Sequence, residues 1–239
     1  MKIKQLCLLF CFFLTACVIR PNGMDWTEKT IKTKHLSFQV WEKSIQEGDD
    51  LRLYIEGDGT PAPDRPIAFE LADRDPNLNV IYISRPCQYV DCAECQNPAL
   101  WQEERFNEEL VNEMKSLIIY LSHKYKSHAI DLIGYDGGGT MAMLLATRIP
   151  VRRVITVGGI LDTKTYATEQ GITLNGLNPM SFRELLSAIP QLHYVGSSDT
   201  KTPSYMAEHF VNRLNNPRSA VIKAVPGATH TDWRGLIVE

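Results

Sequence analysis

The sequence has no block of like charges and no basic stripe. Its 25 lysines and arginines are interspersed with 28 aspartates and glutamates, and the formal net charge is -3. Proteins that follow a nucleic-acid backbone cluster their basic residues, so nucleic acid is not an expected partner. Repeats and low-complexity tracts are also missing. At 239 residues and 44% hydrophobic, the sequence predicts one globular domain with a substantial core.

Motifs that bind nucleotide phosphates are missing as well. The glycine-rich segment GYDGGGT, residues 134–140, has no lysine where a P-loop requires one. Its three consecutive glycines do not have the G-x-G-x-x-G spacing of dinucleotide-binding turns. We therefore expect no nucleotide and no other cofactor.

A long apolar run is confined to the N-terminus and is shorter than the ~20 residues of a permanent membrane span. The run follows two lysines and ends in small residues before a cysteine, in MKIKQLCLLFCFFLTAC, as in a secretory signal. Leu14-Thr15-Ala16-Cys17 resembles the bacterial lipobox. The resemblance implies cleavage before Cys17 and acyl chains such as palmitate on that cysteine. The alternative is a plain signal peptide with a chance cysteine.

This resemblance also implies a location. Val18 follows the cysteine in place of aspartate, which in such lipoproteins favours the outer membrane, with the protein facing the periplasm. Several acyl chains give a stable membrane anchor. We expect residues 1–16 to be the signal peptide, 17–35 a tether and 36–239 the folded domain.

Cysteines are few in the mature chain: Cys87, Cys92 and Cys95 remain besides Cys17. An oxidising compartment favours one short-loop disulfide, and of the three pairings we favour Cys87 with Cys95. Cys92 and Cys95 also form a Cys-x-x-Cys zinc half-site. No second pair of ligands with zinc spacing lies nearby, so no metal is expected.

The mature chain alternates strand and helix patterns. Residues 35–44 and 51–55 alternate apolar and polar side chains and predict a leading antiparallel pair. Short apolar runs that end at glycine, proline or aspartate predict buried parallel strands in residues 79–86, 129–136, 152–159, 191–199 and 219–227. Helical spacing recurs in residues 105–121, 140–148 and 205–214. The pattern predicts a mainly parallel sheet with helices on both faces, and residues 161–190 predict a small lid or a crossover.

The segment DLIGYDGGGTMAMLLA has the build of a nucleophile elbow, a strained turn between strand and helix. Gly134 and Gly138 stand two residues before and after Asp136, where the turn leaves no room for side chains. Asp136 occupies the place of the usual serine. The amide of Gly137 is a candidate oxyanion donor at the helix N-terminus.

The partners of a catalytic triad follow in the order that an α/β hydrolase requires. Asp199 comes just after a predicted strand, and His230 comes just after the last one. There a carboxylate orients the imidazole that faces the elbow. Asp162 is an alternative acid, whereas His193 and His209 fall within a strand and a helix and are expected to be packing or surface residues.

A second glycine turn follows residues 51–55. Gly57 and the amide of Asp58 stand where hydrolases keep their other oxyanion donor. The alternative is a tight turn with no further role.

Several segments together resemble a family of Gram-negative α/β-hydrolase-like lipoproteins: YIEGDG, SRPCQYV, LIGYDGGGTMAMLLA, VGGILDT, LNP, GSSDTKTP and a terminal His-x-x-Trp. The resemblance covers nearly all of the mature chain and implies the α/β-hydrolase fold, and no segment is long enough for a large cap domain. The family's elbow is similar to Gly-Tyr-Ser-Gly-Gly-Gly. Asp136 therefore replaces the family's serine, while Asp199 and His230 match its acid and base.

Asp136 leaves two hypotheses open. A carboxylate nucleophile forms an ester that water then hydrolyses with His230 as base. Haloalkane dehalogenases and epoxide hydrolases share the fold and have Asp in a similar elbow, although their His-Gly-x-Pro motif is absent here. The other hypothesis is a catalytically silent binding or structural envelope lipoprotein in which Asp136 and His230 form an ion pair. A small-molecule substrate or ligand is compatible with both, and the serines Ser84, Ser197 and Ser198 lie outside any glycine elbow.

Overall fold

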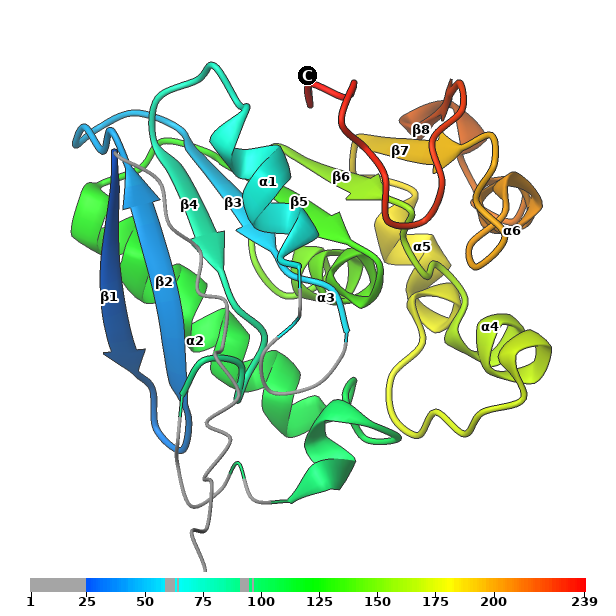
Figure 1. The fold of residues 1–239 in the computed structure, drawn as a ribbon, viewed down its shortest axis with the longest axis horizontal. Helices are drawn as coiled ribbons and strands as arrows, with labels where there is room; N and C mark the ends of the chain where they lie inside the picture. Colours follow the sequence, from blue (N-terminus) through cyan, green and yellow to red (C-terminus); the bar gives the residue numbers. More distant parts are fainter. Residues whose placement is uncertain (1–24, 59–62, 64, 91–94, 96) are drawn as a thin grey trace, which may run out of the picture.

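The computed structural model describes residues 25–58, 63, 65–90, 95 and 97–239. Its strands form one eight-stranded sheet in the order β1-β2-β4-β3-β5-β6-β7-β8 (Figure 1). Their bounds are β1 Trp26–Lys32, β2 Ser37–Lys43, β3 Leu51–Ile55, β4 Val80–Ile83, β5 Ile130–Tyr135, β6 Arg153–Val157, β7 Gln191–Gly196 and β8 Ala220–Val225. From β4 to β8 every neighbouring pair is parallel, which confirms the predicted parallel strands. Burial was predicted wrongly for β8, because it is an edge strand and none of its residues is fully buried.

Helices cover both faces of the sheet, as predicted. The α-helices are α1 Ile67–Asp73, α2 Glu108–Tyr125, α3 Gly137–Ala146, α4 Thr163–Gln170, α5 Arg183–Leu186 and α6 Ser204–Val211, and the short 3-10 helices are η2 Pro98–Trp101, η3 Pro179–Phe182 and η4 Pro217–Ser219. Figure 1 shows α1 and the C-terminal segment on one side of the sheet, and α2 and α3 on the other. None of the helices in the described ranges is long and apolar enough to cross a membrane.

Two apolar layers hold these helices in place. Leu53 and Ile55 of β3 pack in the layer under α2 and α3, whereas Tyr54 between them packs in the layer under α1. Successive side chains of a strand point to opposite faces, so one fully buried strand contributes to both layers. This arrangement places the carboxyl ends of the parallel strands at one edge, where ligands bind in such sheets.

The predicted antiparallel pair is wrong. Strand β2 pairs with β1 and with β4, while β3 lies between β4 and β5 and is parallel to both. All five residues of β3 are buried, which is typical of a central parallel strand. The missing partner, β1, lies within the range predicted as a tether, because the polar side chains of an edge strand give little apolar signal.

Other differences are smaller. Helix α1 was not predicted, because its seven residues are too few to show a helical period. The segment predicted as a lid or crossover contains α4, η3 and α5. It is a crossover in the topological sense, since it joins the parallel neighbours β6 and β7.

Candidate active site

The elbow has the backbone that the glycines predict. Asp136 lies between β5 and α3 with φ 50° and ψ -121°, a strained conformation for a residue with a side chain. A Cβ on Gly134 would lie 2.1 Å from the carbonyl oxygen of Gly138, and a Cβ on Gly138 would lie 2.2 Å from that of Ile55. The close approach of three backbone segments therefore requires glycine at both positions.

The structure brings Asp136, His230 and Asp199 together. His230 Nδ1 lies 2.9 Å from Asp199 Oδ2, and His230 Nε2 lies 3.3 Å from Asp136 Oδ1. Asp199 is held in turn by Thr202, whose hydroxyl donates to Asp199 Oδ2 at 2.8 Å and whose amide donates to Oδ1 at 2.9 Å. This is the relative geometry of nucleophile, base and acid in a hydrolase triad.

The position of His230 is set by its backbone as well as by its ring. Its carbonyl accepts hydrogen bonds from Trp233 Nε1 at 2.7 Å and from the Tyr135 hydroxyl at 3.0 Å. The Tyr135 ring lies 5.4 Å from the imidazole, measured between centroids. The His-x-x-Trp motif thus has a physical role, because Trp233 anchors the turn that presents the imidazole to the elbow.

The electrostatics differ from those of a serine enzyme. Burial lowers the pKa of His230, but hydrogen bonds and charge interactions with Asp136 and Asp199 outweigh it and raise the pKa to about 9. Burial also raises the pKa of Asp136, yet His230 and Lys201 overcome this and hold it well below its usual range. At neutral pH the site is therefore a carboxylate–imidazolium pair.

The amide of Asp58 faces the elbow, as the second glycine turn predicts. It donates to Asp136 Oδ2 at 3.4 Å. The turn is fixed by the buried Glu56, which accepts from the Gly57 amide at 2.9 Å, and by Gln88, whose Nε2 donates to the Gly57 carbonyl at 3.2 Å. One oxygen of Asp136 thus accepts from the Asp58 amide, while the other faces His230.

Gly137 has a neighbour that the sequence does not indicate. A Cβ on Gly137 would lie 2.1 Å from the carboxyl group of Asp58, so that carboxyl group rests directly on the elbow. Asp58 Oδ1 pairs with Arg85 at 2.6 Å and Asp58 Oδ2 pairs with Arg105 at 2.8 Å. Lys201 Nζ lies 3.5 Å from Asp136 Oδ2.

Sequence reasoning missed Arg85, Arg105 and Lys201. Single basic residues in loops are usually solvated, and no spacing connects these three. Lys201 alone had a local signal, because it follows the predicted acid Asp199 by two residues and its amide donates to Asp199 Oδ1 at 2.8 Å.

The alternative residues have other roles. Asp162 caps α4 and accepts from Asn178 Nδ2 at 2.7 Å. His193 is fully buried in β7 with Nδ1 2.9 Å from the Thr156 hydroxyl, and burial lowers its pKa to about 4. His209 lies in α6, as expected.

None of the three serines has the environment of a nucleophile. The buried Ser84 hydroxyl accepts from the Gln39 amide at 3.3 Å and donates to the Gln88 carbonyl at 3.4 Å, which ties the turn after β4 to β2. Ser197 and Ser198 are exposed, and the Ser197 hydroxyl accepts from Gly227.

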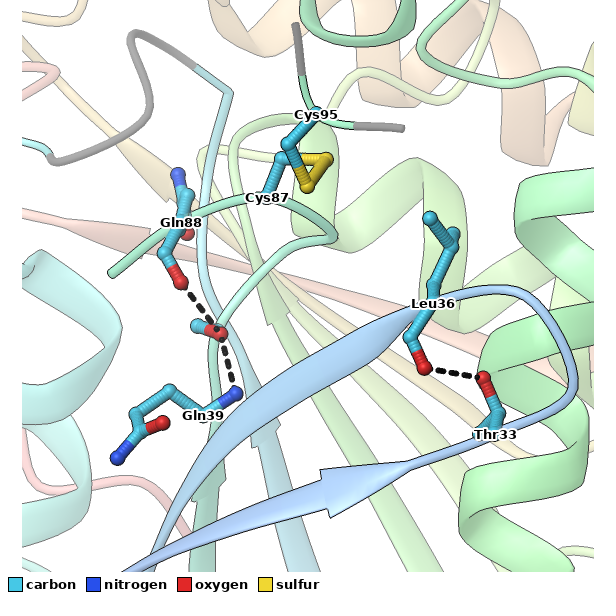
Figure 2. The surroundings of a disulfide bond; sticks show 7 residues. Thr33, Leu36, Gln39, Cys87, Gln88 and Cys95 are labelled. Atoms are coloured by element: carbon cyan, nitrogen blue, oxygen red, sulfur yellow. Dashed lines mark hydrogen bonds between the residues drawn. A yellow bond between two sulfur atoms is a disulfide. The ribbon is translucent and has the colours of Figure 1, made fainter. Parts of the chain in front are cut away.

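Cys87 and Cys95 form a disulfide with Cα atoms 5.2 Å apart, which confirms the favoured pairing (Figure 2). Because their sulfurs are bonded to each other, neither is a zinc ligand. Cys17 and Cys92 lie outside the described residues. Cys87 immediately precedes Gln88, so the disulfide restrains the segment that holds the Gly57 turn.

No protein-family model and no curated protein matches the chain. Solved structures match its fold. Est1E from Butyrivibrio proteoclasticus has a TM-score of 0.62 at 11% identity over 85% of this chain and 90% of that one. An alpha-beta serine hydrolase homologue from Coxiella burnetii has a TM-score of 0.60 at 16% identity over 88% of this chain and 91% of that one. An esterase from Pyrococcus furiosus has a TM-score of 0.62 at 12% identity over 86% of this chain and 83% of that one. The chain has the α/β-hydrolase fold, as predicted.

Proposed function

We propose that this protein is a hydrolase that forms a covalent ester on Asp136 and hydrolyses it with His230. One observation carries the proposal: Asp136 Oδ2 accepts from the Asp58 amide, whereas Asp136 Oδ1 pairs with His230 Nε2 at 3.3 Å and has no other hydrogen-bond partner within the described residues. A carboxylate nucleophile needs one oxygen free to attack and the other at an oxyanion donor.

The substrate class follows from the nucleophile. Attack by a carboxylate on an ordinary ester would give a more reactive anhydride, so the reacting centre is a saturated carbon of an epoxide or a halide. Asp136 Oδ1 forms a bond to that carbon while the carbon–halogen or carbon–oxygen bond breaks, and the leaving group takes the electron pair. A halide substrate gives an ester and a free halide ion, whereas an epoxide gives a hydroxy ester because its ring-opened oxygen takes the proton of the His230 imidazolium.

Ester formation prepares His230 for the second step. It removes the charge of Asp136, one of the two carboxylates that raise the His230 pKa, so the imidazole loses its proton more readily. Neutral His230 takes a proton from water, which attacks Cγ of Asp136. The Asp58 amide stabilises the oxyanion on Oδ2, and His230 returns the proton to the departing alcohol. Water thus supplies the oxygen that remains in Asp136.

A single turnover in heavy-oxygen water tests this mechanism. Epoxide and haloalkane panels are reacted with excess enzyme, and the peptide that contains Asp136 is analysed by mass spectrometry. We expect the label in the Asp136 carboxylate and an unlabelled alcohol product. In Asp136→Asn we expect no label at residue 136 and no alcohol product. Turnover that leaves the Asp136 carboxylate unlabelled for every substrate contradicts the proposal.

A second candidate is a silent binding protein, and the burial of the elbow favours it. Asp136 is only 2% exposed and is paired with both His230 and Lys201, as in a purely structural ion pair. Under this hypothesis neither the wild type nor any variant that retains Asp136 forms an ester with an epoxide or a haloalkane. A trapped ester in His230→Gln, which lacks the base for the second step, rules it out.

We also propose that Cys17 carries lipids that anchor the protein in a bacterial envelope. The support is the basic flank, the apolar run and the lipobox-like sequence that ends at Cys17. Palmitate labelling in a bacterial host, with Cys17→Ser as control, tests the anchor. Incorporation that survives Cys17→Ser contradicts it, and fractionation of labelled cells tests the outer-membrane location.

A further inference from the structure

The ion pairs around Asp136 form one group with an excess of positive charge. Five ion pairs connect Arg85, Arg105, Lys201 and His230 with three carboxylates, those of Asp58, Asp136 and Asp199. Four cations thus face three anions. Ester formation on Asp136 would remove one of these anions, and the loss of the His230 proton would remove one cation, so the positive excess persists and an additional negative charge at the site is favoured.

Most of this group's charge is buried. The side chains of Asp58, Arg85 and Arg105 are 7%, 6% and 13% exposed. Burial raises the pKa of Asp58 although both arginines oppose the rise, so protonation of Asp58 would increase the positive excess. Unbalanced charge in a buried site is costly unless a partner neutralises it.

One buried donor of this group is left without a partner. Within the described residues Arg85 Nε has no hydrogen bond. The neighbouring side-chain atoms are paired with each other, because Asp58 Oδ2 lies 2.8 Å from Arg105 Nε and Asp136 Oδ1 lies 3.3 Å from His230 Nε2. Buried polar groups are normally satisfied, so the unpaired Arg85 Nε is a donor that a ligand can use.

The position of Asp58 shows where an anion would bind. Its carboxyl group lies between the two guanidinium groups, which are centred 5.3 and 5.6 Å from the Phe106 ring, and it rests on Gly137 of the elbow. Asp58 therefore acts as an internal substitute for an anionic group placed beside the nucleophile.

Arg105 also connects this position with the surface. It lines an open hollow of about 680 Å³ together with residues that include Gln102 and Ile172. Arg105, Arg85 and Asp58 together line a second, much smaller cavity. Arg105 is thus shared by the open hollow and by the small cavity beside Asp58.

From these observations we infer that the substrate carries an anionic group, a carboxylate or a phosphate, which Arg105 and Arg85 bind in place of the Asp58 side chain. That the bound anion belongs to a substrate rests on the proposed function, whereas the anion-binding site itself rests on the geometry of Arg85, Arg105 and Asp58. Arginine suits this role because its planar fork binds carboxylate and phosphate oxygens through two donors.

Binding of unreactive probes tests the inference without turnover. Benzoate and benzamide have the same shape and differ in charge, and calorimetry on the full chain measures their affinities, with phenyl phosphate as the phosphate arm. We expect benzoate or phenyl phosphate to bind at least about tenfold more tightly than benzamide. Equal affinities for all three probes overturn the inference, even if epoxides are turned over.

Two variants locate the site. Asp58→Asn removes the internal anion and frees both arginines, so we expect tighter benzoate binding, a gain that misfolding does not produce. Arg105→Gln should weaken binding about tenfold, whereas Arg213→Gln, at an exposed position, should not. Selective binding that is unchanged in Asp58→Asn and in Arg105→Gln overturns the inference.

A matched pair of reactive probes separates this inference from the proposed function. Chloroacetate and chloroacetamide share the same reacting carbon, and formation of an Asp136 adduct is followed by mass spectrometry. Preference for chloroacetate supports both proposals. Equal reaction with both probes keeps the proposed function and overturns the inference. Selective benzoate binding without any adduct keeps the anion site and contradicts the nucleophile.

Discussion

His230 Nε2 lies 3.3 Å from Asp136 Oδ1, and this one relationship sets the chemistry of the site. In a serine enzyme the same nitrogen faces a neutral hydroxyl, and the imidazole is ready to accept a proton. Here Nε2 faces the carboxylate of Asp136, and Nδ1 on the other side of the ring pairs with a second carboxylate, that of Asp199. At neutral pH the pair therefore holds a proton, and removal of the Asp136 charge would release it.

The pH dependence of stability reports on this pair. The His230 pKa is about 9 in the folded chain, above its ordinary value of 6.5. The resulting stabilisation is complete below pH 6.5 and is lost as the pH rises through 9. We expect the wild type to lose at most about 3 kcal/mol of unfolding free energy over this range. Urea unfolding measures it, and a wild type as insensitive to pH as His230→Gln contradicts the ion pair.

Replacing Asp136 with serine should restore ordinary esterase chemistry. The hydroxyl is neutral, so His230 keeps Asp199 as its only carboxylate partner and its pKa falls. We expect Asp136→Ser to hydrolyse p-nitrophenyl acetate roughly 10²-fold faster than the wild type. The double variant with His230→Gln is the control for background hydrolysis. A wild type that already equals Asp136→Ser shows that the native site was never silent toward esters.

Gly138 is required by the close approach of two backbones. A Cβ there would lie 2.2 Å from the Ile55 carbonyl oxygen, whereas a Cβ on Gly235 would meet nothing within 4 Å. We expect Gly138→Ala to lower the unfolding free energy by about 3 kcal/mol and Gly235→Ala to change it by about 0.5 kcal/mol or less. Chemical denaturation compares the two, and equal effects contradict the predicted clash.

The disulfide should stabilise the chain by restricting its unfolded state. The cysteines are 8 residues apart, and closure of so short a loop contributes about 2.5 kcal/mol. We expect Cys95→Ser to lose this amount, and reductant to reduce the stability of the wild type to the same level. If reductant leaves the wild-type midpoint unchanged, the Cys87–Cys95 bond contributes nothing to stability.

Glu56 gives a second pH dependence at lower pH. Burial raises its pKa from 4.5 to about 7, although hydrogen bonds from the Gly57 amide and the Tyr82 hydroxyl oppose the rise. Its contribution to stability is greatest below pH 4.5 and is lost as the pH rises through 7. We expect Glu56→Gln to remove this slope. Unfolding curves between pH 4.5 and 7.5 measure it, and parallel slopes for wild type and variant contradict the assignment.

The strands and the elbow followed from local rules. Glycines around Asp136 and apolar runs that end in turn residues constrain the backbone within a few residues, so strand β5, helix α3 and the strained turn between them were predictable. The places of Asp199 and His230 after their strands were predictable for a related reason. In a parallel sheet the carboxyl ends of neighbouring strands meet at one edge, so residues distant in sequence converge there.

Side-chain convergence from irregular segments was not predictable. Arg85 and Arg105 reach the carboxyl group of Asp58 from loops that have no periodic pattern, and the edge strand β1 is polar on its exposed side. The elbow and the order of the triad residues follow from the sequence alone, because backbone geometry and sheet topology impose them. Only the tertiary structure decides that Asp136 lies beside an imidazolium and a positively charged cluster, because those contacts depend on packing across the whole domain.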